Sequence, residues 1–296
     1  MARGRARLDF QPRPLKGCFD SMLETSFIIL ILAVLLANIV EAITGFGGII
    51  IAVTIAANFF EIPWLVTVLV PINLAISVYI VARHYKKTDT FELMGGIARV
   101  VRERKMVPPA ELMYGILPFA MVGMAIGILV FNIAGSVWLK LAYGVFVLCF
   151  SIWELSRMAT GADKAAAPPP MSRLKSAIWL MGGGFIQGVY GSGGPMIVYY
   201  SSKKLADKGV FRATLSVLWL VLNGIIMTTH IVAGRHDAST LKAIAALVPV
   251  LLLGVFIGEK LHSKMPERAF RVFVFSLLVF AGSALLVSGA RQAFGG

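Results

Sequence analysis

The sequence predicts an all-α polytopic membrane protein built from two internal repeats, each a glycine-broken helical segment followed by three transmembrane helices. Hydrophobic residues make up 58% of the 296-residue chain, and the mean hydropathy is +0.82, whereas soluble domains average roughly 45–50% apolar residues. Uncharged runs close to the ~20 residues that a helix needs to cross a bilayer recur along the chain. Two of these runs contain a similar glycine-rich motif, and this similarity predicts the repeat.

The net charge of +13 falls mainly in the N-terminal tail and between the apolar runs. Membrane loops near anionic headgroups have this distribution, so we expect a lipid bilayer and no nucleic acid as a partner. The basic tail, residues 1–20, leads into an apolar run longer than the core of a signal peptide, which predicts a retained span. Whether Met22 is the true start is left open. Cys18 and Cys149 lack metal or redox spacing, so we expect no metal site and no cofactor.

The first transmembrane repeat is expected over residues 21–158. Its first segment, residues 25–60, is uncharged except for Glu41 and contains the first glycine motif. Polar and basic residues 83–109 follow the next span, and within them residues 91–101 have the pattern of an interfacial amphipathic helix. The three spans expected after the broken segment are residues 64–82, 112–132 and 137–153.

Residues 159–172 are predicted to be a linker, because three consecutive prolines cannot continue a helix. The second repeat is expected over residues 173–296. It starts with an uncharged segment, residues 176–202, which contains the second glycine motif. The three spans expected after it are residues 213–234, 241–258 and 272–290, the first of them interrupted only by His230.

The two glycine motifs read E-A-I-T-G-F-G-G over residues 41–48 and Q-G-V-Y-G-S-G-G-P over residues 187–195. They share G-x-G-G in the same register, and the acid of the first copy is an amide in the second. Glycine lets the backbone leave a helix without a Cβ penalty. At membrane depth such a break is tolerated only where the freed backbone faces protein or a polar cavity. Paired breaks in corresponding halves therefore indicate a transporter substrate site.

The similarity between the halves extends beyond these motifs. Residues 118–127 and 249–258 share the pattern P-x4-G-x3-G, and Asn73 and Asn223 occupy similar places in the second span of each half. The G-x3-G spacing puts both glycines on one helix face, where two backbones can approach closely. We interpret these glycines as packing residues rather than ligand-binding residues. Together the matches favour internal duplication.

The charge bias of the loops switches between the halves. Basic connections are residues 83–105 and the linker in the first half, but residues 203–212 and 260–271 in the second, which is the opposite pair. Inverted-topology repeats predict this switch. Inversion needs an odd number of crossings per half, as would follow if each glycine segment were a re-entrant hairpin. Eight plain crossings would make the halves parallel, and the basic N-terminal tail favours that alternative.

This arrangement resembles the TauE/SafE (sulfite exporter) family. Residues 188–195 are similar to the family signature G-x-x-x-G-x-G-G-P, residues 212–214 also resemble the family pattern, and the likeness covers residues 33–287. The first motif departs from the pattern, because Ile49 stands where a third glycine is usual and the proline is absent. The resemblance implies that the substrate is a small sulfur-containing or carboxylate anion, such as sulfite, sulfoacetate or a related organosulfonate.

The residues point to an anion site independently of the resemblance. A helix restarting after Gly48 or Gly194 exposes its first N–H groups and its positive dipole end. Such an end binds sulfonate or carboxylate oxygens without a buried cation. Asn73 and Asn223 remain open to a second interpretation, as partners in an interhelical hydrogen bond. The candidate substrate-binding residues are Thr44, Gly45, Gly47, Gly48, Asn73, Gln187, Tyr190, Gly191, Ser192, Gly193, Gly194, Pro195, Thr214 and Asn223.

Glu41 and His230 are the candidates for proton coupling, with a proton as the coupling ion. An ionisable residue inside a membrane run is a functional hypothesis by default. The alternatives are a neutral Glu41 that is capped near the interface, and a neutral His230 that makes a hydrogen-bonded helix contact.

The predicted function is a secondary transporter that exports small sulfur-containing anions across a bacterial inner membrane as a multi-pass protein. The alternative is an uptake permease or channel for another small anion, such as a carboxylate. An enzyme is disfavoured because the sequence has no H-E-x-x-H or G-x-S-x-G motif. An ATP-driven pump is disfavoured because no G-x4-G-K-[ST] loop occurs. The expected partners are a small anionic substrate, the bilayer and the coupling proton, and homodimer formation is left open.

Overall fold

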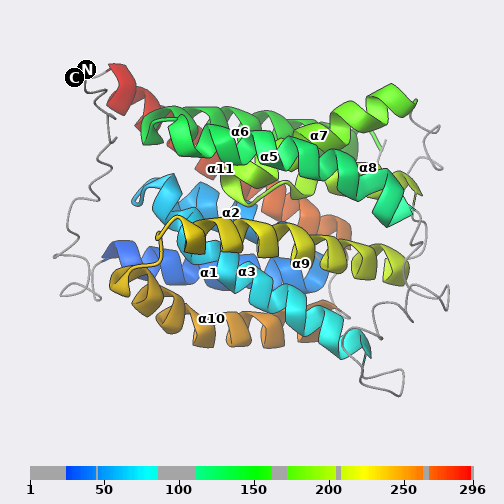
Figure 1. Ribbon diagram of the computed structural model, residues 1–296, viewed down its shortest axis with the longest axis horizontal. Coiled ribbons are helices and arrows are strands. Elements are labelled where there is room, and N and C mark those ends of the chain that lie inside the picture. The colour runs from blue at the N-terminus through cyan, green and yellow to red at the C-terminus, as the bar shows by residue number, and fades with distance from the viewer. Residues whose placement is uncertain are drawn as a thin grey trace, which may run out of the picture.

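The computed structural model describes residues 25–44, 46–85, 111–161, 172–204, 208–262 and 267–294. All secondary structure within these ranges is helical, so the predicted all-α class is confirmed. The long helices run roughly along one direction of the molecule (Figure 1). The basic tail, Gly45, the helix expected at residues 91–101 and most of the linker lie outside the described residues.

The first half begins with α1, which is 20 residues long and continues through Glu41 without a break. The next helix, α2, has only 9 residues, about 14 Å at 1.5 Å per residue, and is too short to cross a hydrocarbon core of about 30 Å. The described elements of this half are α1 (Thr25–Thr44), α2 (Gly48–Ala56), α3 (Ile62–Tyr85), the π-helical turn η1 (Glu111–Ile116), α5 (Leu117–Ile133) and α6 (Ser136–Ala159).

The second half repeats the order of one long helix, one short helix and three long helices. Ser172 caps the start of α7, where its hydroxyl accepts a hydrogen bond from the Lys175 backbone N–H at 3.4 Å. The short helix α8 has 11 residues, which again is too short to span a bilayer. The elements are α7 (Arg173–Tyr190), α8 (Gly194–Lys204), α9 (Lys208–Val232), α10 (Ala238–His262) and α11 (Glu267–Phe294).

Within the described part of the chain, 7 helices are long and apolar enough to cross a membrane. They comprise all the long helices except α7, which begins with Arg173 and Lys175. The protein is therefore a multi-pass membrane protein.

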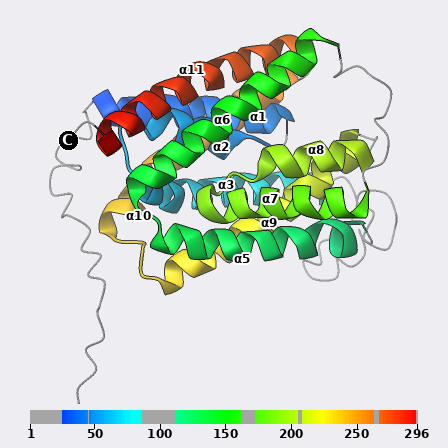
Figure 2. The same cartoon turned by 90° about the horizontal axis from the view of Figure 1, so that it is seen from above.

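The two halves interlock. The most extensive contacts between long helices join α5 to α7, α6 to α11, α1 to α10 and α3 to α9, and in each pair one helix comes from each half. Figure 2 shows α5 beside α7 on one side of the molecule and α6 crossing α11 on the other. The buried core is therefore shared by the two halves.

Close packing of glycines explains the contact between α5 and α7. A Cβ at Gly123 would overlap the backbone of Met181, and a Cβ at Gly127 would overlap the carbonyl of Phe185. The later residue of α5 contacts the later residue of α7, so the two helices run parallel. The packing interpretation of this G-x3-G pattern is confirmed.

The second G-x3-G pattern joins α10 to α1 in the same way. A Cβ at Gly254 would lie 3.1 Å from the Leu35 carbonyl oxygen, and one at Gly258 would lie 2.8 Å from the Ile39 carbonyl oxygen. Here too the later residue of one helix contacts the later residue of the other, so α1 and α10 run parallel. Glycine is required at these positions by the short distance between the helix backbones.

Candidate functional site

Both glycine motifs lie where one helix ends and a short one begins. α1 ends at Thr44, Gly47 has φ 91°, and α2 begins at Gly48. In the second motif α7 ends at Tyr190, Gly191 has φ 66°, and α8 begins at Gly194. Both dihedral angles lie in the left-handed region that favours glycine, which explains why the chain turns at these residues.

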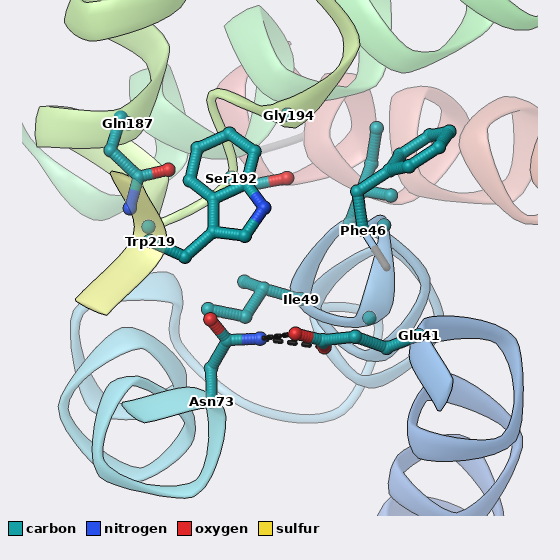
Figure 3. Close-up of a pocket in the computed structure, with 12 residues that line it drawn as sticks. Glu41, Phe46, Ile49, Asn73, Gln187, Ser192, Gly194 and Trp219 are labelled. Carbon is teal, nitrogen blue, oxygen red and sulfur yellow. Dashed lines mark hydrogen bonds between the residues drawn. The ribbon is translucent and has the colours of Figure 1, made fainter. Parts of the chain in front are cut away.

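The two motifs face each other across one pocket. A Cβ placed on Gly194 would lie 3.9 Å from the backbone nitrogen of Gly47, so the turns nearly touch. The pocket has a volume of about 20 Å³, somewhat more than the ~10–15 Å³ that one water needs. Figure 3 shows its labelled residues, which come from α1, α2, α3, α7, α8 and α9 and from the two glycine turns. The lining residues are Glu41, Phe46, Gly47, Gly48, Ile49, Ile50, Asn73, Gln187, Gly191, Ser192, Gly194 and Trp219.

Two helix N-termini reach the wall of this pocket. Gly48, Ile49 and Ile50 form the first turn of α2, and Gly194 starts α8. The first backbone N–H groups of a helix have no partner within the helix, and the helix dipole makes this end positive. No Lys or Arg lines the pocket within the described chain. The site can therefore attract an anion through neutral backbone donors.

A chain of hydrogen bonds joins the two motifs beside the pocket. Gly193 donates its backbone N–H to Gln187 Oε1 at 2.7 Å, and Gln187 Nε2 donates to Asn223 Oδ1 at 2.7 Å. Asn223 Nδ2 donates to Asn73 Oδ1 at 2.5 Å, and Asn73 Nδ2 donates to both Glu41 carboxyl oxygens at 2.6 Å. We call this the amide relay. Each of its three amides accepts one bond and donates the next, so the relay runs in one direction and ends on Glu41.

Glu41 is the buried end of the amide relay, with 3% of its surface exposed. It has no ion-pair partner among the described residues, and burying a charge without a partner is costly. Its carboxyl lies so close to Gly48 that a Cβ there would overlap it. The same carboxyl also lines a second cavity of about 10 Å³ on the side of Asn38. Glu41 thus lines both the pocket between the glycine turns and a smaller, mostly apolar cavity.

Three of the predicted site residues shape the turns instead of lining the pocket. The Thr44 hydroxyl lies 2.8 Å from the Val40 carbonyl oxygen and 2.7 Å from that of Phe46. Tyr190 donates its hydroxyl hydrogen to the Leu139 carbonyl at 3.0 Å. The N–H of Gly193 is already bonded within the amide relay. These groups are occupied by the protein itself.

The remaining predicted residues lie further from the pocket. Pro195 is the second residue of α8, and Thr214 is buried in α9. His230 is 4% exposed, stacks on Phe131 with ring centroids 5.5 Å apart, and lines neither cavity. The structure therefore places the two candidate proton carriers in different surroundings, and only Glu41 adjoins the pocket.

Sequence reasoning did not select four of the lining residues. Phe46, Ile49 and Ile50 adjoin or interrupt the first glycine motif, and this adjacency is the signal that could have identified them. Trp219 precedes Asn223 by one helical turn on α9, so it shares a helix face with that residue. Because the repeat had already singled out Asn223, the residue one turn before it on the same helix face could have been selected too.

The chain is similar to known transporters. The family model described as sulfite exporter TauE/SafE matches residues 30–285. Over 171 residues, which are 57% of this chain and 69% of the relative, the sequence is 25% identical to the "Probable inner membrane transporter protein TsaS" of Comamonas testosteroni. No solved structure matches the chain.

Proposed function

The chain belongs to the TauE/SafE family of sulfite exporters, and from this premise we propose that it is a secondary transporter exporting sulfite or a small organosulfonate. The observation that carries the proposal is the convergence of the α2 and α8 N-termini on one pocket. Backbone N–H groups at helix N-termini are suited to sulfonate and sulfite oxygens. The similarity to an inner membrane transporter supports a bacterial inner membrane location.

Among the described residues no Lys or Arg lines the pocket, and this suits transport. A Lys or Arg in the pocket would hold the anion through a strong charge-assisted bond. Neutral N–H donors attract the anion less strongly, so it can leave again on the other side of the membrane. The site lies between elements of both halves, which is where substrate sites of repeat-built transporters occur.

The size of the pocket supports a closed conformation. At about 20 Å³ the pocket has room for about one water, whereas sulfite has four heavy atoms. Binding therefore requires the lining to move outward. We propose that this conformation has access to neither side, and that movement of the α2 and α8 turns opens the pocket to each side in turn.

Helix directions support inverted-topology repeats. α1 begins at the left of the molecule in Figure 1 and α7 begins at the right. The glycine contacts make α5 parallel to α7 and α10 parallel to α1, as an inverted pair of repeats requires. The ends of α3, α6, α8 and α10, which adjoin the basic connections, gather at the right. We propose that this end is cytoplasmic, since Lys and Arg accumulate in cytoplasmic loops.

Glu41 is the proposed proton carrier. It adjoins the pocket, it is buried without a cation, and the amide relay connects it to the second glycine turn. An anion that displaces this turn would alter the hydrogen bonds along the relay and hence the environment of Glu41. We propose that export of the anion is coupled to proton movement in this way.

The test is a thermal-shift screen of the purified protein followed by flux measurements in liposomes. Sulfite, sulfoacetate and isethionate are expected to raise the unfolding temperature more than taurine or plain carboxylates do. In liposomes, addition of the stabilising anion is expected to produce substrate-dependent proton flux. Stabilisation by carboxylates alone, or anion flux with no proton flux, would favour the permease or channel alternative.

A further inference from the structure

Trp219 places an unpaired donor in the pocket. The residue is 5% exposed and lies on α9, and its ring forms part of the pocket wall. Its indole nitrogen Nε1 is buried and has no hydrogen-bond partner among the residues that the structure describes. Buried indole N–H groups normally find a partner, because an unsatisfied buried donor is costly. Because Trp219 lines the pocket, a bound anion can supply the acceptor.

Two other tryptophans of the described chain also have a buried indole N–H without a partner. Trp64 stacks on Phe60 with ring centroids 5.0 Å apart, and Trp179 packs against Tyr199 with centroids 5.2 Å apart. Neither of them lines the pocket or the smaller cavity beside it. Of these three residues only Trp219 lines the pocket, and the other two provide natural controls.

The amide side chains that line the pocket are already bonded. The Asn73 amide donates to Glu41, and the Gln187 amide donates to Asn223. In the view of Figure 3 the indole of Trp219 lies between Gln187 and Phe46, and its nitrogen is on the edge turned away from Gln187. The nitrogen therefore lies on the side of the ring away from the amide relay.

We propose that Trp219 is a specificity-determining residue whose indole N–H donates a hydrogen bond to an oxygen of the transported anion. This inference rests on the proposed function, because it takes the pocket to be the anion site. An indole N–H can only donate, so it can pair with an oxygen of a sulfur oxyanion or carboxylate and cannot pair with a ligand ammonium group. The ring lies beside the α8 turn, since a Cβ at Gly194 would be 3.8 Å from Trp219 Cζ2, an ordinary van der Waals distance.

The experiment compares Trp219→Phe with Trp64→Phe. Phenylalanine keeps an aromatic ring in each position but removes the N–H donor. Affinity for sulfite and sulfoacetate is measured by isothermal titration, with a size-exclusion check that each variant is monodisperse. We expect Trp219→Phe to bind both anions at least tenfold more weakly, as for a lost hydrogen bond to a charged group, and Trp64→Phe to bind as the parent does.

Equal affinity of Trp219→Phe and the parent would overturn the inference while leaving the proposed function in place. Equal losses in both variants would also overturn it, because the effect would then be general. If the parent binds carboxylates but no sulfur oxyanion, the proposed substrate is wrong, and the same comparison is made with the carboxylate.

A measurement on the parent protein covers the case in which Trp219→Phe does not fold. The parent is labelled with 15N at the indole nitrogens of its 5 tryptophans, and the indole signals are recorded by NMR during a sulfite titration. We expect one indole N–H signal to move downfield as its proton enters a hydrogen bond. A titration that saturates by calorimetry and moves no indole signal would contradict the proposal.

Discussion

Gly194→Val tests the anion pocket by filling it. A Cβ at Gly194 would meet Trp219 Cζ2 at 3.8 Å, the Gly47 nitrogen at 3.9 Å and Phe46 Cβ at 4.0 Å, all ordinary van der Waals distances. Gly194 is also absent from the glycines with positive φ. Valine is therefore accommodated without backbone strain. Its two methyl groups would enter a pocket of about 20 Å³, which has room for roughly one water.

The expected effect is on binding rather than on folding. Because the valine methyl groups compete with the anion for the same volume, affinity for sulfite should fall at least tenfold, which is about 1.4 kcal/mol. The change in helix propensity is favourable or less than about 1 kcal/mol in magnitude, so the variant should remain folded. Affinity is measured by isothermal titration, and folding by the unfolding temperature.

The matched control is Gly224→Val on α9. A Cβ at Gly224 would meet nothing within 4 Å, so the variant adds the same side chain outside the pocket. Gly183→Ala, which lies outside the turn and which sequence reasoning would choose as a mild control, is unsuitable because its Cβ would lie 2.7 Å from Ile197 Cγ1. If Gly194→Val binds sulfite as tightly as Gly224→Val does, the pocket between the turns is not the anion site.

Three further predictions concern coupling, the amide relay and orientation. Glu41→Gln keeps an oxygen that can accept the hydrogen bond from Asn73, so the variant should still bind the anion. Anion flux in liposomes should no longer depend on a pH gradient, and an unchanged dependence would give Glu41 a purely structural role. Asn223→Leu removes the acceptor of Gln187 and should lower the free energy of unfolding by about 1–3 kcal/mol, measured by denaturant titration. The control is Thr228→Ala, which changes an exposed residue of the same helix. A smaller loss of unfolding free energy in Asn223→Leu than in this control would contradict the relay's stabilising role. Lys175→Cys and Gly234→Cys, each in a cysteine-free background, test the orientation with a membrane-impermeant thiol reagent. Lys175→Cys should react only from the cytoplasmic side and Gly234→Cys only from the outside. Labelling of both variants from one side would exclude the proposed topology.

The sequence predicted the helical membrane class because hydrophobic span length is a strong and local signal. It also selected Glu41, Asn73, Gln187 and Asn223 individually, since polar residues are conspicuous within apolar runs. Their connection into one relay was not predictable, because it depends on how α3 and α9 pack against each other. Asn73 and Asn223 turn out to be hydrogen-bond partners of each other, and Asn73 also lines the pocket.

Trp219 shows why part of the site was missed. A tryptophan inside an apolar span is typical of packing. Whether its indole N–H has a hydrogen-bond partner depends on neighbours that other helices contribute. The reverse holds for Tyr190 and Thr44, whose hydroxyls suggested ligand contacts. Both hydroxyls lie within reach of backbone carbonyls instead. Residue type indicates which groups can bond, but the packing of the helices decides which groups remain available.

The most direct test of the central claim is the flux of radiolabelled sulfite out of proteoliposomes. The account predicts that the parent protein gives a saturable efflux that unlabelled sulfoacetate inhibits. It also predicts that Gly194→Val reduces this efflux at least tenfold, whereas Gly224→Val leaves it unchanged. Efflux from parent proteoliposomes no faster than from protein-free liposomes, or equal efflux for the two valine variants, would contradict export of sulfur anions through the pocket between the glycine turns.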